Sequence, residues 1–320
     1  LPGNVNIPAG DYIFLFFVAC AGIPISIVMM PKHWLLKHQI IAIMLVSALA
    51  RYAFLPMALS DDVNRYMWEG RLLINGVSPY SNAPRPECDT LRGRSTDRTD
   101  SAQEFRSADD PFYCGINHPH MTAIYPPLFI AFCGVTGVIN YSPLGWKLVV
   151  FLADLLVVWL LLVELRRKKL PVRLALLYGL HPLILTAFVG HGHQDVFMIV
   201  GILGAIIARS QRKWRLMFLL LGLAIQVKYF PILIVPLFIN RLNWRKAWIA
   251  LAVGLGPLVP FLFKDGMSVF ASFRTFGHAF TFNSSIHGLV MLMTKNIHFA
   301  TIVCEVLFIL IWLAIMIKLH

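Results

Sequence analysis

Two adjacent carboxylates, Asp61 and Asp62, follow a long apolar run that ends near Leu59. This position places acid groups at the mouth of a membrane helix, where ionisable side chains are costly unless they have a partner or a function. A carboxylate there can take the proton from a hydroxyl that attacks a sugar carbon, which is general base catalysis. With two acids, one can act as the base while the other accepts hydrogen bonds or binds a cation. A helix cap is the structural alternative, since Ser and Asp are favoured at that position.

Three further polar clusters lie at other predicted helix ends. Lys228 stands between apolar residues, where its charge can stabilise a departing phosphate. A lysine that extends its amine to the membrane surface is the structural alternative. The segment with His191, His193 and Asp195 offers groups that recognise sugar hydroxyls or phosphate. The alternatives are a structural turn and a metal site. The His-x-His-x-Asp pattern alone is weak evidence for a metal site, and no metal is predicted. The fourth cluster runs from Arg274 to His287.

Composition determines the class of protein that must position these groups. The 320 residues are 58% hydrophobic and only 14% charged, whereas soluble domains carry about a quarter charged residues. We therefore predict an all-α, polytopic integral membrane protein with a single domain over residues 1–320. The net charge of +12 comes largely from Lys and Arg in short loops between apolar segments. Such a pattern indicates orientation in the membrane rather than a nucleic-acid partner.

Apolar runs of about 20 residues predict the spanning helices. The strongest basic cluster, Arg166–Lys169, is expected in the cytoplasm, which places Asp61 on the outer face. Tyr125–Ile139 is short for a crossing and is predicted to be a half-helix in the outer leaflet. The predicted crossings are Asp11–Met30, Gln39–Leu59, Trp146–Leu165, Val172–Gly190, Val196–Ala208, Ala247–Phe263 and Ala300–Ile317.

Leu216–Ile239 has basic links on both sides, so both of its ends favour the cytoplasm. We predict a re-entrant helical hairpin whose apex lies near Lys228 and Pro231, with a single straight span as the alternative. Between the crossing that ends at Phe263 and the last span, Lys264–His298 is expected to be a polar and aromatic outer loop.

Residues 60–124 form the longest polar region, which we predict to be an outer loop. Its first part has the apolar spacing of an amphipathic helix and is expected to lie on the membrane surface. Arg85–Asp110 has few apolar residues and is expected to be a flexible loop. Cys88 and Cys114 flank this polar stretch, and a disulfide between them is an open possibility.

Several of these stretches resemble one known group of enzymes. The motif Asp61-Asp62-Val63-Asn64-Arg65-Tyr66-Met67-Trp68-Glu69-Gly70-Arg71, followed by Gly76-Val77-Ser78-Pro79-Tyr80, resembles the first outer loop of GT-C glycosyltransferases. The nearest set is the polyprenyl-phosphate-mannose-dependent mannosyltransferases related to glycosyltransferase family 87. Three further stretches are similar to that family: Tyr125-Pro126-Pro127-Leu128, His181-Pro182-Leu183-Ile184 with Gly190-His191-Gly192-His193-Gln194-Asp195, and Val227-Lys228-Tyr229-Phe230-Pro231. His181 and Gln194 depart from it, since the family usually has Asn there.

The resemblance implies a GT-C-like bundle with outer juxtamembrane helices and an inverting transferase that uses a lipid-phosphate sugar without a nucleotide or other cofactor. It favours Asp62 over Asp61 as the base, with Asp61 and Arg65 fixing the geometry. The residues expected at the donor phosphate and lipid are Lys228, Arg65, Arg274 and Tyr229. Those expected to bind substrate are His191, His193, Asp195, Tyr66, Trp68, Glu69, Arg71, Tyr80 and Asn283.

The resulting hypothesis is transfer of a hexose, with mannose as the expected sugar, from polyprenyl phosphate to a glycan, lipid or protein hydroxyl outside a bacterial inner or plasma membrane. A lipid or sugar transporter or flippase is the alternative from another class. It would predict sites near the bilayer midplane and internal repeats, neither of which stands out in the sequence. A lipid-binding assembly subunit without chemistry is a further alternative, in which Asp62 would be dispensable.

Overall fold

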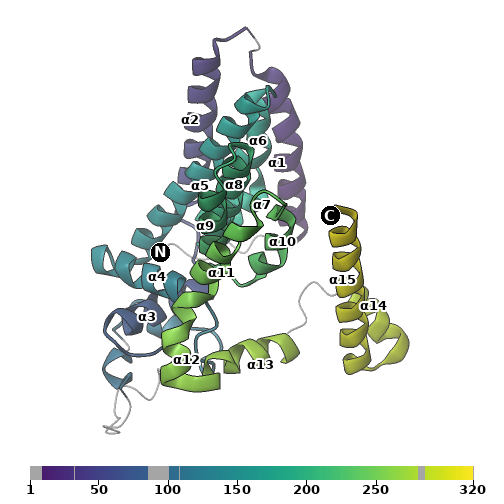
Figure 1. The fold of residues 1–320 in the computed structure, drawn as a ribbon. Helices are drawn as coiled ribbons and strands as arrows, with labels where there is room; N and C mark the ends of the chain where they lie inside the picture. Colours follow the sequence, from purple (N-terminus) through teal and green to yellow (C-terminus); the bar gives the residue numbers. More distant parts are fainter. Residues whose placement is uncertain (1–8, 32, 86–100, 108, 280–284, 320) are drawn as a thin grey trace.

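A computed structural model describes residues 9–31, 33–85, 101–107, 109–279 and 285–319, and every regular element in these ranges is helical (Figure 1). The α-helices are α1 (Ala9–Met29), α2 (Leu36–Phe54), α3 (Asp61–Ile74), α4 (Pro127–Ile139), α5 (Pro143–Arg167), α6 (Leu176–Gly179), α7 (Pro182–Leu185), α8 (Asp195–Ser210), α9 (Trp214–Ile225), α10 (Val235–Phe238), α11 (Trp248–Leu255), α12 (Val259–Asp265), α13 (Ala271–Ala279), α14 (Ser285–Thr294) and α15 (Ile297–Leu319). Short 3-10 or π segments are η1 (Gln103–Phe105), η2 (Tyr113–Gly115), η3 (Val172–Ala175), η4 (Thr186–Gly190), η5 (Phe230–Ile234), η6 (Trp244–Lys246), η7 (Gly256–Leu258) and η8 (Gly266–Phe270).

Three helical stretches among the described residues are long and apolar enough to cross a membrane: Pro143–Arg167, Trp244–Gly277 and Ile297–Lys318. The pair Val172–Gly179 and Pro182–Gly190, bent by 56°, would make a fourth if it is one broken span. The predicted helices at Trp146–Leu165 and Ala300–Ile317 are thus confirmed by α5 and α15. The polar loop predicted for Lys264–His298 is wrong for most of its length, because α13 and α14 occupy it.

The helical hairpin predicted for Leu216–Ile239 is confirmed. Helix α9 ends at Ile225, and the chain turns through Lys228 and returns as η5 and α10 (Figure 1). The return brings the Leu237 carbonyl to 3.0 Å from Nη1 of Arg209, which lies at the end of the preceding helix α8. The two ends of the hairpin therefore lie near the same basic link, and Lys228 lies at its apex.

A buried ion pair explains how Arg51 can interrupt an apolar helix. Its Nε lies 2.8 Å from a carboxylate oxygen of Asp154, and both side chains are fully buried. Tyr178 donates a hydrogen bond of 2.7 Å to the other oxygen of Asp154, and Arg51 also donates to the Gly179 carbonyl. These contacts of Arg51 and Asp154 tie α2 to α5 and α6.

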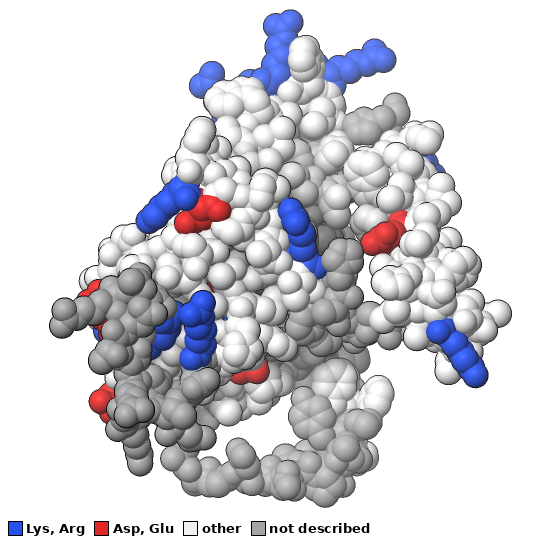
Figure 2. All heavy atoms as spheres, turned by 90° about the horizontal axis from the view of Figure 1, so that it is seen from below, with Lys and Arg blue, Asp and Glu red and all other residues white. Residues whose placement is uncertain are grey.

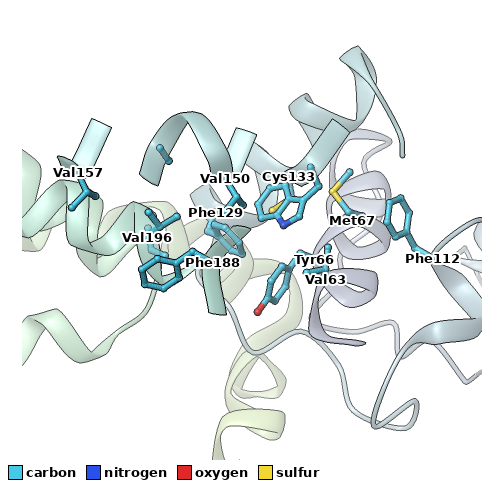
Figure 3. Close-up of a cluster of buried hydrophobic side chains, with 13 residues drawn as sticks. Val63, Tyr66, Met67, Phe112, Phe129, Cys133, Val150, Val157, Phe188 and Val196 are labelled. Atoms are coloured by element: carbon cyan, nitrogen blue, oxygen red, sulfur yellow. The ribbon is translucent and has the colours of Figure 1, made fainter. Parts of the chain in front are cut away.

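The amphipathic helix predicted in the outer region is present as α3, and one of its faces packs against α4. Its place on the membrane surface stays a prediction. Val63, Tyr66 and Met67 of α3 join Phe129 and Cys133 of α4 in one buried cluster (Figure 3). The contact is close because Gly70 and Gly134 face each other without side chains. A Cβ atom on Gly134 would lie 2.4 Å from the Gly70 carbonyl oxygen.

We expect Gly134→Ala to destabilise the protein by about 1–3 kcal/mol, the usual cost of inserting a methyl group into a packed contact. Thermal unfolding in detergent measures this loss. Gly22→Ala in α1 is the matched control, since a Cβ there meets no atom within 4 Å. Equal melting temperatures for the two variants would contradict the close α3–α4 contact.

The end of the Arg85–Asp110 segment is folded, against the expectation of a flexible loop. Ala102 and Phe105 are buried beside Trp68, whose indole N–H donates to the Phe105 carbonyl at 2.9 Å. Two apolar side chains suffice here because Trp68 of α3 offers them a buried surface. Cys114 is disulfide-bonded, while Cys88, its predicted partner, lies outside the described residues.

Candidate active site

A cavity of about 680 Å³ brings the predicted acid and the predicted lysine together. Asp62 and Arg65 of α3 contribute one wall, and Lys228 and Tyr229 at the hairpin apex contribute another. Residues 117–126 complete its polar side, and side chains of η5 and α13 complete its apolar side. The apolar lining consists of Ile124, Phe230, Ile232, Leu233, Phe273 and Phe276. The cavity can therefore hold a molecule that is polar at one end and apolar at the other.

Asp62 is positioned by the first turn of α3. Ser60 is the N-cap, and its hydroxyl accepts from the Asp62 backbone N–H at 3.4 Å. The carboxylate therefore lies beside the positive end of the α3 helix dipole. The side-chain amide of Asn117 donates to Asp62 Oδ1 at 2.8 Å, which leaves the other carboxylate oxygen available. Asp61 is exposed, accepts a hydrogen bond from the Ser60 hydroxyl and does not line the cavity.

Arg65 is committed to oxygen atoms of the protein. Its guanidinium donates to Glu69 Oε1 at 2.8 Å and to four backbone carbonyls at 2.8–3.2 Å. Those carbonyls belong to Asn117, His118, Met121 and Thr122. Arg65 therefore holds the segment that carries Asn117 to Asp62, in agreement with its expected part in fixing the geometry. It also lines the cavity, and its place at the donor phosphate stays a prediction.

Glu69 is buried beneath Arg65. Burial raises the pKa of its carboxyl from 4.5 to about 7, although the neighbouring Arg65 guanidinium opposes the shift. A raised pKa in the folded state means that stability falls as pH rises from about 4.5 to about 7, because the unfolded chain releases this proton first.

We expect the free energy of unfolding of Glu69→Gln, relative to that of the parent protein, to increase by on the order of 3 kcal/mol as pH rises from 4.5 to 7. The reason is that glutamine resembles the protonated acid and carries no charge to bury. Melting temperatures of both proteins across this pH range measure the difference. A constant difference would contradict the raised pKa of Glu69.

Lys228 forms an ion pair with Asp195, with 2.7 Å between Nζ and Oδ1. Asp195 is the first residue of α8, so the pair joins that helix to the hairpin apex. The lysine side chain retains 38% of its exposure. A cation that is held at one side and open at the other can bind a second anion. Beside it, Tyr229 packs edge-on against Phe273 of the apolar wall.

The sequence also contains a region that is similar to a known protein family. Residues 123–319, more than half of the chain, match glycosyltransferase family 87. The chain belongs to this family. No curated protein and no solved structure matches it. The family match includes Lys228 and Asp195 but begins after Asp62, which the fold brings to the same cavity as Lys228.

Three residues that were predicted to bind substrate in this glycosyltransferase are buried, and each forms a hydrogen bond with another residue of the protein. Tyr66 is buried, donates to the side-chain carbonyl of Gln194 and packs edge-on against Tyr125. Tyr80 is also buried, and its hydroxyl donates to the Tyr125 carbonyl at 2.7 Å. Trp68 is buried against η1. Burial raises the pKa of both Tyr66 and Tyr80, which keeps their phenols protonated.

The other predicted residues that the structure describes do not line this cavity. The two imidazoles flank it: His191 Nδ1 lies 3.1 Å from the Ala58 carbonyl, and burial lowers the pKa of His193. Arg274 is exposed on α13, where its neighbours Phe273 and Phe276 line the cavity. Arg71 lines a different cavity, and Asn283 lies outside the described residues.

Sequence reasoning missed Asn117, which contacts Asp62, and the backbone of residues 117–122. The motif Tyr125-Pro126 did point to this wall, but nothing around Asn117 distinguished it from other polar loop residues. Over the part of the chain that the structure describes, no three His, Cys, Asp or Glu side chains gather in a way that could hold a metal ion.

Proposed function

We propose that this membrane glycosyltransferase transfers a hexose, with mannose as the expected sugar, from polyprenyl phosphate to an acceptor hydroxyl. The observation that carries the proposal is the single cavity in which Asp62 and Lys228 lie with an apolar wall. A lipid-phosphate sugar has the three parts that such a cavity accommodates: a polar sugar, an anionic phosphate and an apolar chain.

In this mechanism Asp62 removes the proton from the acceptor hydroxyl as its oxygen attacks the anomeric carbon. The bond between that carbon and the phosphate oxygen breaks, and the electron pair leaves with the phosphate. Lys228 stabilises the negative charge that develops on the leaving group. Attack opposite to the departing phosphate inverts the anomeric configuration. The lipid phosphate is the second product, and the proton is held on Asp62.

The orientation of α5 supports an extracytoplasmic site. The basic residues Arg166–Lys169 lie at the end of this helix. Near its start, the Trp146 indole N–H donates at 2.8 Å to the carbonyl of Gly192, three residues before Asp195, the partner of Lys228. A helix of 25 residues is about 37 Å long, enough to separate the two ends by a bilayer. With the basic end in the cytoplasm, Asp62 and Lys228 face the outer side.

Both acidic and basic side chains are scattered over the end of the molecule seen from below (Figure 2), unlike the continuous basic surface of a nucleic-acid-binding protein.

The experiment is a transfer assay with the purified protein in nanodiscs. Radiolabelled mannosyl polyprenyl phosphate is compared with the nucleotide sugar as donor, and simple alcohols and oligosaccharides serve as acceptors. We expect transfer from the lipid donor only, with inversion of the anomeric configuration in the product. Use of the nucleotide sugar would contradict the proposed donor. Movement of the lipid across the bilayer without transfer would favour a flippase.

A further inference from the structure

A second cavity, of about 580 Å³, lies at the other end of α3. It is lined by Arg71 and Asn75 from the end of this helix, by Ser107 and Asp109 from the folded part of the outer loop, and by Tyr141. It shares no lining residue with the cavity that contains Asp62. Arg71 follows Asp62 by nine positions in α3, which corresponds to about 13 Å along the helix axis and places the two side chains on opposite faces of the helix.

Arg71 is held in one orientation at this cavity. Its Nη1 donates to Asp110 Oδ2 at 2.7 Å, and the guanidinium lies 5.6 Å from the ring of Phe105 and 5.5 Å from that of Tyr141. Asp110 is in turn fixed by backbone N–H groups of Phe112 and Tyr113 and by the Tyr141 hydroxyl. The Arg71 side chain is nevertheless 40% exposed. A guanidinium fixed on one edge and accessible on another is already oriented for a ligand.

A purely structural role would explain only part of this arrangement. An ion pair between Arg71 and Asp110 suffices to attach the outer loop to α3, and burying it completely would serve that purpose. The open cavity over the pair, and the exposed carboxylate of Asp109 on its rim, are not required for attachment.

The charges of the cavity indicate the class of ligand. Among the described residues, its lining carries one positive charge, on Arg71, and two negative charges, on Asp109 and Asp110. A phosphate or other polyanion would therefore meet net repulsion. Neutral hydroxyls both donate and accept hydrogen bonds, and so can pair with carboxylates, an amide and a guanidinium together. The apolar side chains of Ile74, Pro111 and Val138, with the Tyr141 ring, provide weakly polar surface for the carbon face of a sugar ring.

We propose that this cavity binds a neutral saccharide unit of the acceptor, remote from the hydroxyl that reacts at Asp62. The inference rests on the proposed function for the identity of the ligand as an acceptor. Arg71 and Asp109 select the sugar, and α3 fixes the spacing between the two cavities. The glycosyltransferase thereby prefers acceptors long enough to occupy both.

Direct binding tests the cavity without requiring catalysis. The probes are neutral tetrasaccharides of mannose, glucose, galactose and N-acetylglucosamine, titrated against the protein in nanodiscs. We expect at least one to bind, and Arg71→Lys and Asp109→Asn each to weaken that binding about tenfold. Glu104→Gln is the matched control, since Glu104 is exposed on the same loop but does not line the cavity. Absence of binding by every probe, or binding that Asp109→Asn leaves unchanged, would overturn the proposal.

Asp109→Asn also keeps the test independent of folding, because Asp109 is exposed and the substitution retains its size. Binding must persist in Asp62→Asn, which distinguishes this cavity from the proposed reaction centre. In transfer assays, Asp109→Asn should raise the KM of a tetrasaccharide acceptor about tenfold and leave kcat and the KM of a simple alcohol unchanged. Binding without any transfer would support the cavity and reject the proposed function. Transfer without such binding would do the reverse.

Discussion

Asp62→Asn is expected to reduce kcat by about a thousandfold, within the range that general base catalysis contributes. Asparagine retains the oxygen that accepts the 2.8 Å hydrogen bond from Asn117, so the wall of the cavity is preserved. It cannot, however, take a proton from the acceptor hydroxyl. Single-turnover transfer from the lipid donor measures the effect, and an unchanged melting temperature establishes that the variant is folded.

The neighbouring acid provides the matched control. Asp61→Asn should alter kcat by no more than a few-fold, because Asp61 is exposed and does not line the cavity. The reverse order of effects, with Asp61→Asn inactive and Asp62→Asn active, would reject the assignment of the base. Asn117→Ala should fall between the two, since it removes the side chain that orients Asp62 but leaves the carboxylate in place.

The convergence of Asp62 and Lys228 could be predicted from the sequence because it depends on topology. Basic links on both sides of Leu216–Ile239 required a hairpin, and a hairpin places its apex at the opposite face. Asp62 follows an apolar run that starts from a basic link. Counting such links is therefore enough to bring both residues to one side, without any knowledge of packing.

The supporting contacts could not be predicted in this way. Arg65 binds four backbone carbonyls of residues 117–122, and every residue type carries such a carbonyl. Trp68 and Tyr80 look like ligands of a sugar in the sequence, because aromatic residues beside a carboxylate motif suit that role. Their partners are backbone carbonyls of the protein, at Phe105 and Tyr125. Such contacts cannot be predicted from the spacing of residues in the sequence, because they depend on how the outer loop folds back over α3.

Lys228→Met is expected to reduce kcat by about 10²–10³-fold, the usual effect of removing one group that stabilises charge in the transition state. Methionine has a similar length and remains compatible with the apolar residues at the hairpin apex. Part of the loss would come from Asp195, which the substitution leaves as an unpaired anion close to the departing phosphate. The double variant Lys228→Met/Asp195→Asn removes this repulsion, so its kcat reports the missing cation alone. Lys228→Arg should retain more activity than either.

The leaving group separates a role for Lys228 in chemistry from a role in binding. A hexose attached to polyprenyl phosphorothioate, with sulfur at a non-bridging position, has a less basic leaving group, which needs less stabilisation as the bond breaks. The loss of kcat caused by Lys228→Met should therefore shrink with this donor. If Lys228 only binds the donor, the variant will instead raise KM with both donors and leave kcat near that of the parent, because interactions equal in the ground and transition states do not alter kcat. A kcat and a KM that are both unchanged with both donors would leave Lys228 as a structural partner of Asp195 and would require another cation at the phosphate.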